Sequence, residues 1–283
     1  VHYYRFEQIW SEINPMPLYS ATMKSCIEKK TEITKGGAVY NSTSFSLIGI
    51  GTFIDSLYAI KKTVFEDRKY TLEHLKEMIK ADFQGFEADR QYLMNKLPKY
   101  GQTDAGVDKL AKQVFHDLAK HSSGMPNPRG GYYEASLFAF FFYDFVKENT
   151  WATPDGRHAG QRISRGCNPG ETSENIDAAT LMNSLRSIDM AEYPGCGVTY
   201  LEMPVSQTDT DVALFEYILS AFVHCGGSAL DFNVVDKDKL IKAKENPDQY
   251  RNLVVRVCGY SAPFISLSEE LQDEIIQRAL RNG

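Results

Sequence analysis

The sequence has no apolar run long enough to cross a bilayer and no surplus of positive charge. Its longest strongly apolar stretch, residues 135–146, is interrupted by Asp144, whereas a membrane-spanning helix needs about 20 apolar residues. The formal net charge is −6, with 31 basic against 37 acidic residues. A nucleic-acid-binding surface needs a cluster of positive charge, often interleaved with aromatic residues. We therefore expect no membrane segment and no nucleic-acid partner.

Cysteine is scarce, because Cys26, Cys167, Cys196, Cys225 and Cys258 are the only five among 283 residues. Their odd number and irregular spacing argue against the disulfide framework of a secreted protein and favour a reducing compartment such as the cytoplasm. No pair has the two-residue spacing of zinc or redox motifs, and the six histidines also lack ligand spacing. We therefore expect no metal site.

The composition is that of a globular protein, with 43% hydrophobic and 24% charged residues. Apolar residues recur at helical spacing between about residues 53 and 121. A loop rich in glycine and proline follows at residues 124–131, and Thr-Pro-Asp-Gly at residues 153–156 is a strong turn signal. We place the main boundary of the chain just after this turn, at about residue 160.

The last third of the chain alternates between strand and helix patterns, which predicts an α/β architecture. One apolar run, residues 253–255, is typical of a strand buried on both faces. Ser266 and Glu269 fit a capping box that would begin a final helix. The other predicted strands are residues 197–205 and 228–235, and the other predicted helices are residues 212–222 and 237–244.

The most informative segment runs from Arg256 to Phe264 and reads Arg-Val-Cys-Gly-Tyr-Ser-Ala-Pro-Phe. It resembles the signature of glycyl radical enzymes, Arg-Val-x-Gly-Tyr followed shortly by an aromatic residue. The chain as a whole resembles the C-terminal portion of such an enzyme, of the pyruvate formate-lyase-like kind. Six further stretches resemble recurrent stretches of this family, in the family's order: residues 36–41, 55–62, 129–131, 151–157, 232–236 and 250–256.

The resemblance implies a fold and a set of site residues. The family fold is a ten-stranded α/β barrel surrounded by helices. Residues 1–160 would form the C-terminal part of the pyruvate formate-lyase-type barrel domain, and residues 161–283 would form the glycine radical domain. Gly259 would be the catalytic residue that stores a backbone radical. The radical-loop motif around it would comprise Arg256, Val257, Tyr260, Ser261 and Phe264.

The same resemblance implies partners but no bound cofactor. A separate radical S-adenosylmethionine activating enzyme, which carries a [4Fe-4S] cluster, installs the glycyl radical. The stored radical takes hydrogen from a cysteine on a second loop, and the resulting thiyl radical attacks a small-molecule substrate. An anaerobic, cytoplasmic setting and a homodimer of the full-length protein are further expectations.

Glycine suits position 259 for a physical reason. A radical on the backbone Cα flattens toward planarity, where the flanking amide nitrogen and carbonyl delocalise the unpaired electron. Glycine has no Cβ to clash in this geometry, and its backbone is the least restricted of all residues. We also expect the apolar run before the glycine to hold the loop inside a core, away from solvent and oxidants.

The cysteines depart from the family pattern. The family's thiyl cysteine lies well upstream of the glycine in a Gly-Cys context, and in family spacing that position falls before Val1. None of the five cysteines fits the role, including Cys258 beside the glycine. The chain also starts at Val1 with no basic-then-apolar leader. We therefore expect a fragment or half of a split enzyme, inactive without the missing N-terminal half of the barrel.

The motif also bears on which branch of the family, and so which reaction, the chain resembles. The Gly-Tyr-Ser-Ala run at residues 259–262 looks more like the dehydratase, lyase and decarboxylase branches than the formate C-acetyltransferase (pyruvate formate-lyase) branch, which stays an alternative. Another alternative is a non-catalytic replacement subunit that docks on a damaged enzyme.

A nucleotide-binding module is a third class of function. Gly49-Ile50-Gly51 is a partial dinucleotide fingerprint, but the third glycine and a well-placed acidic residue are missing. The full motif requires both in a strand–helix–strand unit. Close backbone packing is therefore the favoured interpretation of this glycine pair.

Overall fold

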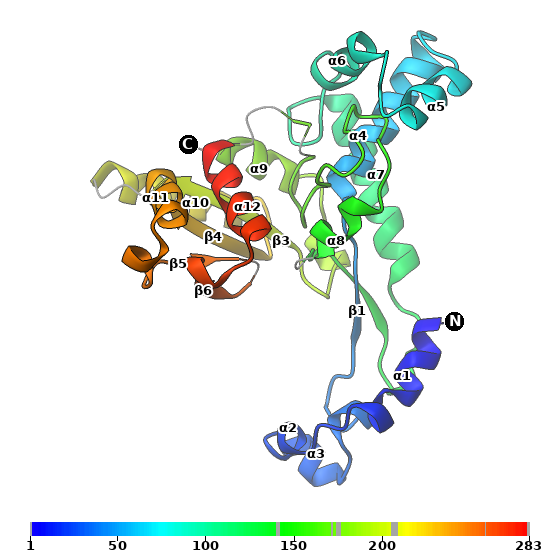
Figure 1. Ribbon diagram of the computed structural model, residues 1–283. Helices are drawn as coiled ribbons and strands as arrows, with labels where there is room; N and C mark the ends of the chain where they lie inside the picture. Colours follow the sequence, from blue (N-terminus) through cyan, green and yellow to red (C-terminus); the bar gives the residue numbers. More distant parts are fainter. Residues whose placement is uncertain are drawn as a thin grey trace.

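The computed structural model describes residues 2–139, 142–170, 172–173, 177–204, 209–257 and 259–281. Helices surround short parallel strands, and the N-terminal helices project to one end of the molecule (Figure 1). These helices are α1 (His2–Ile13), α2 (Pro17–Ala21) and α3 (Lys24–Lys29). No described helix combines the length and the apolar character that a membrane span requires.

The strands form two parallel pairs, and one parallel bridge links the two pairs side by side. β1 (Thr43–Ser46) pairs with β2 (Tyr133–Ser136), and β3 (Val198–Pro204) pairs with β4 (Ala229–Val235). A parallel bridge between Leu137 and Gly197 connects the end of β2 to the beginning of β3. The strands β1, β2, β3 and β4 therefore follow one another in a staggered parallel array.

Parallel strands need long crossover connections, and here the crossovers supply most of the helices. The side chain of Thr71 accepts a hydrogen bond from the His74 amide, and that of Asp104 accepts from Gly106 and Val107, so both residues cap helix N-termini. The helical prediction for residues 53–121 is confirmed. Between β1 and β2 lie α4 (Ile50–Ile60), a π-helix (Lys61–Glu66), α5 (Leu72–Lys80), α6 (Glu87–Asn95) and α7 (Ala105–Ser122).

The main core lies between these helices and the strands. α8 (Phe142–Glu148) and α9 (Ala178–Leu185) precede β3, and α10 (Asp209–His224) connects β3 to β4. Apolar side chains from several of these elements pack together with less than a tenth of their surface exposed. They include Ile54, Tyr100, Val107, Phe115, Leu137, Leu185, Leu201, Ile218 and Phe222.

The C-terminal elements have an apolar cluster of their own. α11 (Lys237–Glu245) is followed by an antiparallel hairpin of β5 (Val254–Arg256) and β6 (Ser261–Pro263), and then by α12 (Glu269–Arg281), which lies beside β3 (Figure 1). Four 3₁₀ turns complete the described elements: Ile33–Lys35, Met190–Glu192, Pro247–Tyr250 and Phe264–Ser266. The buried cluster comprises Leu240, Ala243, Val255, Val257, Phe264, Ile275, Ile276 and Ala279.

The predicted α/β architecture is confirmed, but two details of the last third are wrong. Val255 is 2% exposed whereas Val254 is 58% exposed, because Val255 packs into the C-terminal apolar cluster while the opposite face of β5 stays open. The capping box is also wrong. The hydroxyl of Ser266 donates to the Pro263 carbonyl, while that of Ser268 accepts from the Leu271 amide, so α12 begins after Ser268.

Candidate active site

Gly259 lies in the tight turn that joins β5 to β6. Arg256 is paired with Ser261 across the hairpin, and the Val257 amide donates to the Tyr260 carbonyl over 2.9 Å. The φ angle of Gly259 is +77°, a left-handed conformation that glycine adopts without the steric cost that other residues incur. The turn therefore favours glycine at this position on conformational grounds, independently of any chemistry.

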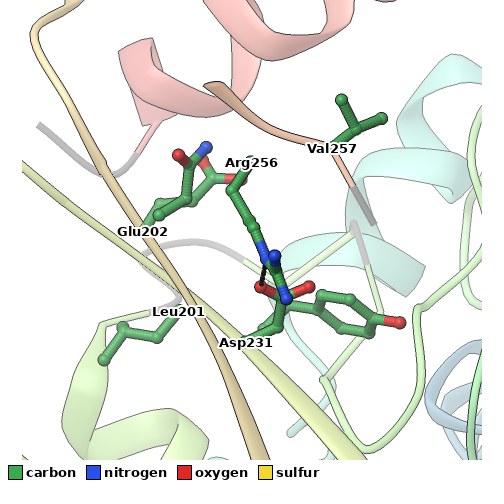
Figure 2. Close-up of a pocket in the computed structure, with 7 residues that line it drawn as sticks. Leu201, Glu202, Asp231, Arg256 and Val257 are labelled. Atoms are coloured by element: carbon green, nitrogen blue, oxygen red, sulfur yellow. Dashed lines mark hydrogen bonds and ion pairs between the residues drawn. The ribbon is translucent and has the colours of Figure 1, made fainter. Parts of the chain in front are cut away.

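Asp231 holds the turn from the side of the neighbouring sheet. Its Oδ2 accepts the Gly259 N–H over 2.9 Å, and its Oδ1 accepts the Arg256 Nε–H over 3.0 Å. Figure 2 shows the Arg256 side chain reaching toward Asp231 across the space beside β3 and β4. Asp231 belongs to β4 and its side chain is only 8% exposed, so the carboxylate is the fixed point of this arrangement.

A small pocket surrounds this contact and is lined by charged groups as well as apolar ones. Glu202 of β3 lines it, and its carboxylate lies 3.7 Å from the guanidinium of Arg165. That guanidinium also lies over the ring of Tyr200, 4.9 Å from its centroid. Each of the two acidic groups in the pocket, Glu202 and Asp231, is therefore paired with an arginine. The lining residues are Tyr200, Leu201, Glu202, Asp231, Asn233, Arg256 and Val257.

The remaining predicted motif residues divide between anchors and surface. Val257 and Phe264 are 2% and 0% exposed and belong to the C-terminal apolar cluster, so they anchor the chain where it leaves β5 and where it leaves β6. Tyr260 is 44% exposed and Ser261 is exposed. Four of the motif residues, Arg256 included, thus surround Gly259 in the hairpin, while Phe264 anchors the segment that follows.

The expectation that the loop is held inside a core is wrong for the described chain. Gly259 is exposed, and a Cβ built on it would have Phe138 as its nearest neighbour, at 3.9 Å. The apolar residues before it bury only one face of β5 and place the turn at the edge of the β3–β4 sheet. Shielding of Gly259 therefore requires atoms outside those described.

The described cysteines are thiols with structural surroundings. Cys167 is fully buried in the main core, and burial raises the pKa of its thiol well above the usual range, which disfavours the thiolate. Cys26 is buried against Gly37, while Cys196 and Cys225 are partly exposed. Cys258 lies outside the described residues. Among the described residues, no group of three or more His, Cys, Asp or Glu side chains is placed to hold a metal ion.

Two of the family-like stretches build a buried polar network away from the turn. Oδ1 of Asp55 accepts from the Tyr100 amide over 2.7 Å, and burial raises the pKa of Asp55 to about 7, opposed by the charge of Lys99. The Lys99 ammonium donates to the carbonyls of Leu93 and Asp155. This network joins α4 to the end of α6 and to the turn at residues 153–156.

The glycine pair near residue 50 serves close packing. Gly49 has φ +80° at the start of α4, and a Cβ on Gly51 would lie 2.6 Å from the carbonyl oxygen of Asn168. Because the backbone near Asn168 lies so close to Gly51, there is no room for a side chain at this position. The favoured interpretation of the pair as a packing feature therefore has a direct structural reason.

Sequence reasoning does not single out Asp231. The one available signal is an acidic residue in the middle of an apolar predicted strand, residues 228–235, where a charge is costly unless it is paired. Its partners, Arg256 and Gly259, are more than 20 residues away in sequence. Only the pairing of β4 with β3 and the position of the hairpin bring the three together.

Comparison with known proteins gives two adjacent family matches. The family model described as "Pyruvate formate lyase-like" matches residues 2–143, and the one described as "Glycine radical" matches residues 163–265. Trans-4-hydroxy-L-proline dehydratase of Clostridioides difficile is 33% identical over 96% of this chain and 35% of that protein. The probable dehydratase YbiW of Escherichia coli K12 is 35% identical over 92% of this chain and 34% of that protein.

Solved structures agree with the sequence matches. The hydroxyproline dehydratase of C. difficile with bound trans-4-hydroxy-L-proline superposes with a TM-score of 0.88 at 32% identity, over 99% of this chain and 36% of that one. A glycyl radical enzyme from Archaeoglobus fulgidus gives a TM-score of 0.87 at 29% identity, over 97% and 35% of the two chains. The chain thus spans about a third of the length of these relatives.

Proposed function

The chain belongs to the glycyl radical enzyme family, and on that premise we propose that Gly259 stores a backbone radical used to break a bond in a small-molecule substrate. The observation that carries the proposal is the setting of Gly259: a left-handed glycine at the tip of a hairpin, within the family's motif, with its amide bound to Asp231. The fold is part of the family's α/β barrel. We assign residues 1–160 to the barrel domain and 161–283 to the glycine radical domain.

The proposed chemistry transfers hydrogen atoms. The Gly259 Cα radical takes a hydrogen atom from a cysteine thiol, so a Cα–H bond forms, the S–H bond breaks and the unpaired electron passes to sulfur. The thiyl radical then removes a hydrogen atom from the substrate, and the reverse transfers restore the glycyl radical. An activating enzyme of the radical S-adenosylmethionine class, with its [4Fe-4S] cluster, creates the radical by removing the first hydrogen atom from Gly259.

We propose that the thiyl cysteine lies outside this chain. A Cβ built on Gly259 would have only a ring atom of Phe138 within 4 Å, apart from its chain neighbours, so none of the described cysteines Cys26, Cys167, Cys196 and Cys225 lies against the glycine. Cys258 is the direct neighbour of Gly259 in sequence, where the family has no catalytic residue. The chain would then be inactive until a companion segment supplies the cysteine loop.

Exposed apolar surface supports such a companion. Both α1 and α10 carry many large apolar side chains that are exposed. Large exposed apolar patches normally mark surfaces that contact another chain. The companion would complete the barrel, cover the Gly259 turn and, in the full-length protein, allow a homodimer in an anaerobic cytoplasm. The exposed side chains are Val212, Leu214, Phe215, Tyr217, Leu219 and Val223 on α10, and Tyr3, Phe6, Ile9 and Ile13 on α1.

The names of the relatives favour elimination and related bond cleavage. They include a hydroxyproline dehydratase, a sulfopropanediol dehydratase and isethionate sulfite-lyases. In all of these, a small polar substrate loses a leaving group or is split. We therefore place this chain in a dehydratase or lyase rather than in an acetyltransferase.

A substrate panel tests this function. We would supply the chain with its barrel companion, the activating enzyme, S-adenosylmethionine and a reductant under anaerobic conditions, and offer trans-4-hydroxy-L-proline, propane-1,2-diol, glycerol and isethionate. We expect product from at least one substrate of this class, and no product with Gly259→Ala. Turnover that survives in Gly259→Ala, or release of formate from pyruvate and coenzyme A alone, would contradict the proposal.

A further inference from the structure

The carboxylate of Asp231 occupies an unusual position for an acidic side chain. It lies within β4, whose partner β3 runs beside it with Tyr200 in register, and the side chain is 8% exposed. Burial of a carboxylate is unfavourable unless the charge is paired and hydrogen-bonded. Here both oxygens have partners, and both partners belong to the hairpin that carries Gly259.

The two partners have different roles in this contact. Arg256 supplies a charge-assisted hydrogen bond that neutralises the carboxylate and binds β5 to β4. Gly259 supplies only its backbone N–H, which is the amide directly attached to the Cα proposed to carry the radical. The anion therefore acts on the nitrogen that is bonded directly to that carbon.

We propose that Asp231 is the positioning residue of the radical site, an inference that rests on the function proposed above. By accepting the Gly259 N–H, the carboxylate fixes the orientation of the peptide plane. It also draws the N–H proton toward itself and raises electron density on nitrogen, which strengthens donation into the half-filled Cα orbital. Arg256 holds the carboxylate in place. The strength of the hydrogen bond at the Gly259 amide therefore depends on both Asp231 and Arg256.

The test compares Asp231 variants by electron paramagnetic resonance. Asp231→Asn keeps the shape and removes the charge, and Asp231→Leu removes both acceptors. Asp248→Asn is the matched control, because Asp248 is 89% exposed and forms a 2.6 Å ion pair with Arg251 that does not involve Gly259. The protein is labelled with ¹⁵N-glycine, activated with its barrel companion present, and its glycyl spectrum is recorded.

We expect a smaller ¹⁵N coupling and a changed α-proton splitting in both Asp231 variants, with the Asp248 control identical to wild type. A folding defect alone would lower the amount of radical without changing these couplings. Unchanged couplings in both Asp231 variants would overturn the positioning role, even if Gly259 carries the radical.

Amide exchange provides a second measurement that needs no radical. Loss of a hydrogen bond to a charged acceptor should speed deuterium uptake at Gly259 about tenfold in Asp231→Leu, with no change in Asp248→Asn. If wild type forms no glycyl radical but exchange responds as expected, the proposed function fails while the contact stands. If wild type forms the radical and neither couplings nor exchange change, the role of Asp231 alone is refuted.

Discussion

Gly259 combines a conformational demand with a chemical one. Its φ of +77° would cost an L-residue about 1 kcal/mol or more, and a radical at its Cα would need the same freedom from a Cβ. Gly226, at the end of α10, meets only the conformational demand, with φ +79° and open space around it. The two glycines therefore allow conformational and chemical effects of an alanine substitution to be separated.

Asp55 should make the stability of the fold depend on pH. Burial raises its pKa in the folded state to about 7 from the usual value of 3.8, so between these pH values the folded protein binds a proton that the unfolded chain has released. The contribution of Asp55 to stability is full below about pH 4 and is lost as the pH rises through 7. We expect Asp55→Asn to flatten this part of the profile, measured by urea unfolding between pH 4 and 8. An unchanged profile would contradict the burial argument.

At the scale of elements, Val255 is the residue of β5 that packs into the C-terminal cluster. Val255→Ala should lower the free energy of unfolding by about 2 kcal/mol, because its side chain is 2% exposed in the C-terminal cluster. Val254→Ala, on the open face of the same strand, should change it by less than about 0.5 kcal/mol. Urea denaturation of both variants measures the difference. Equal losses would mean that both faces of β5 are buried.

The sequence predicts the helices and strands well, but it predicts poorly which of them pack against each other. Helical spacing and capping signals are local, so the helices from α4 to α7 and the strands β3 and β4 follow from residues close in sequence. Burial of each face of β5 depends on which elements pack against that face, so the apolar run at residues 253–255 misleads. Asp231 is missed for the same reason, because its partners Arg256 and Gly259 come from a distant hairpin.

At the scale of the whole molecule, the strands form an array with open edges. β1 to β4 are parallel and staggered, and the described strands do not close on themselves. Figure 1 shows the N-terminal helices at one end of the molecule, and α10 packs against β4, where the rings of Phe215 and Phe232 are 4.7 Å apart. Both α1 and α10 also carry exposed apolar side chains. The family motif could be found from sequence alone, whereas the exposure of Gly259 depends on what covers these surfaces.

The most direct test is an electron paramagnetic resonance measurement that identifies which residue carries the radical. The activated protein, with its barrel companion, is prepared as wild type, Gly259→Ala and Gly226→Ala, and wild type is also prepared with glycine deuterated at Cα. We predict an α-proton doublet in wild type and Gly226→Ala, its collapse on deuteration, and no doublet in Gly259→Ala. A doublet that persists in Gly259→Ala, or its absence from fully assembled wild type, would contradict the assignment of the radical to Gly259.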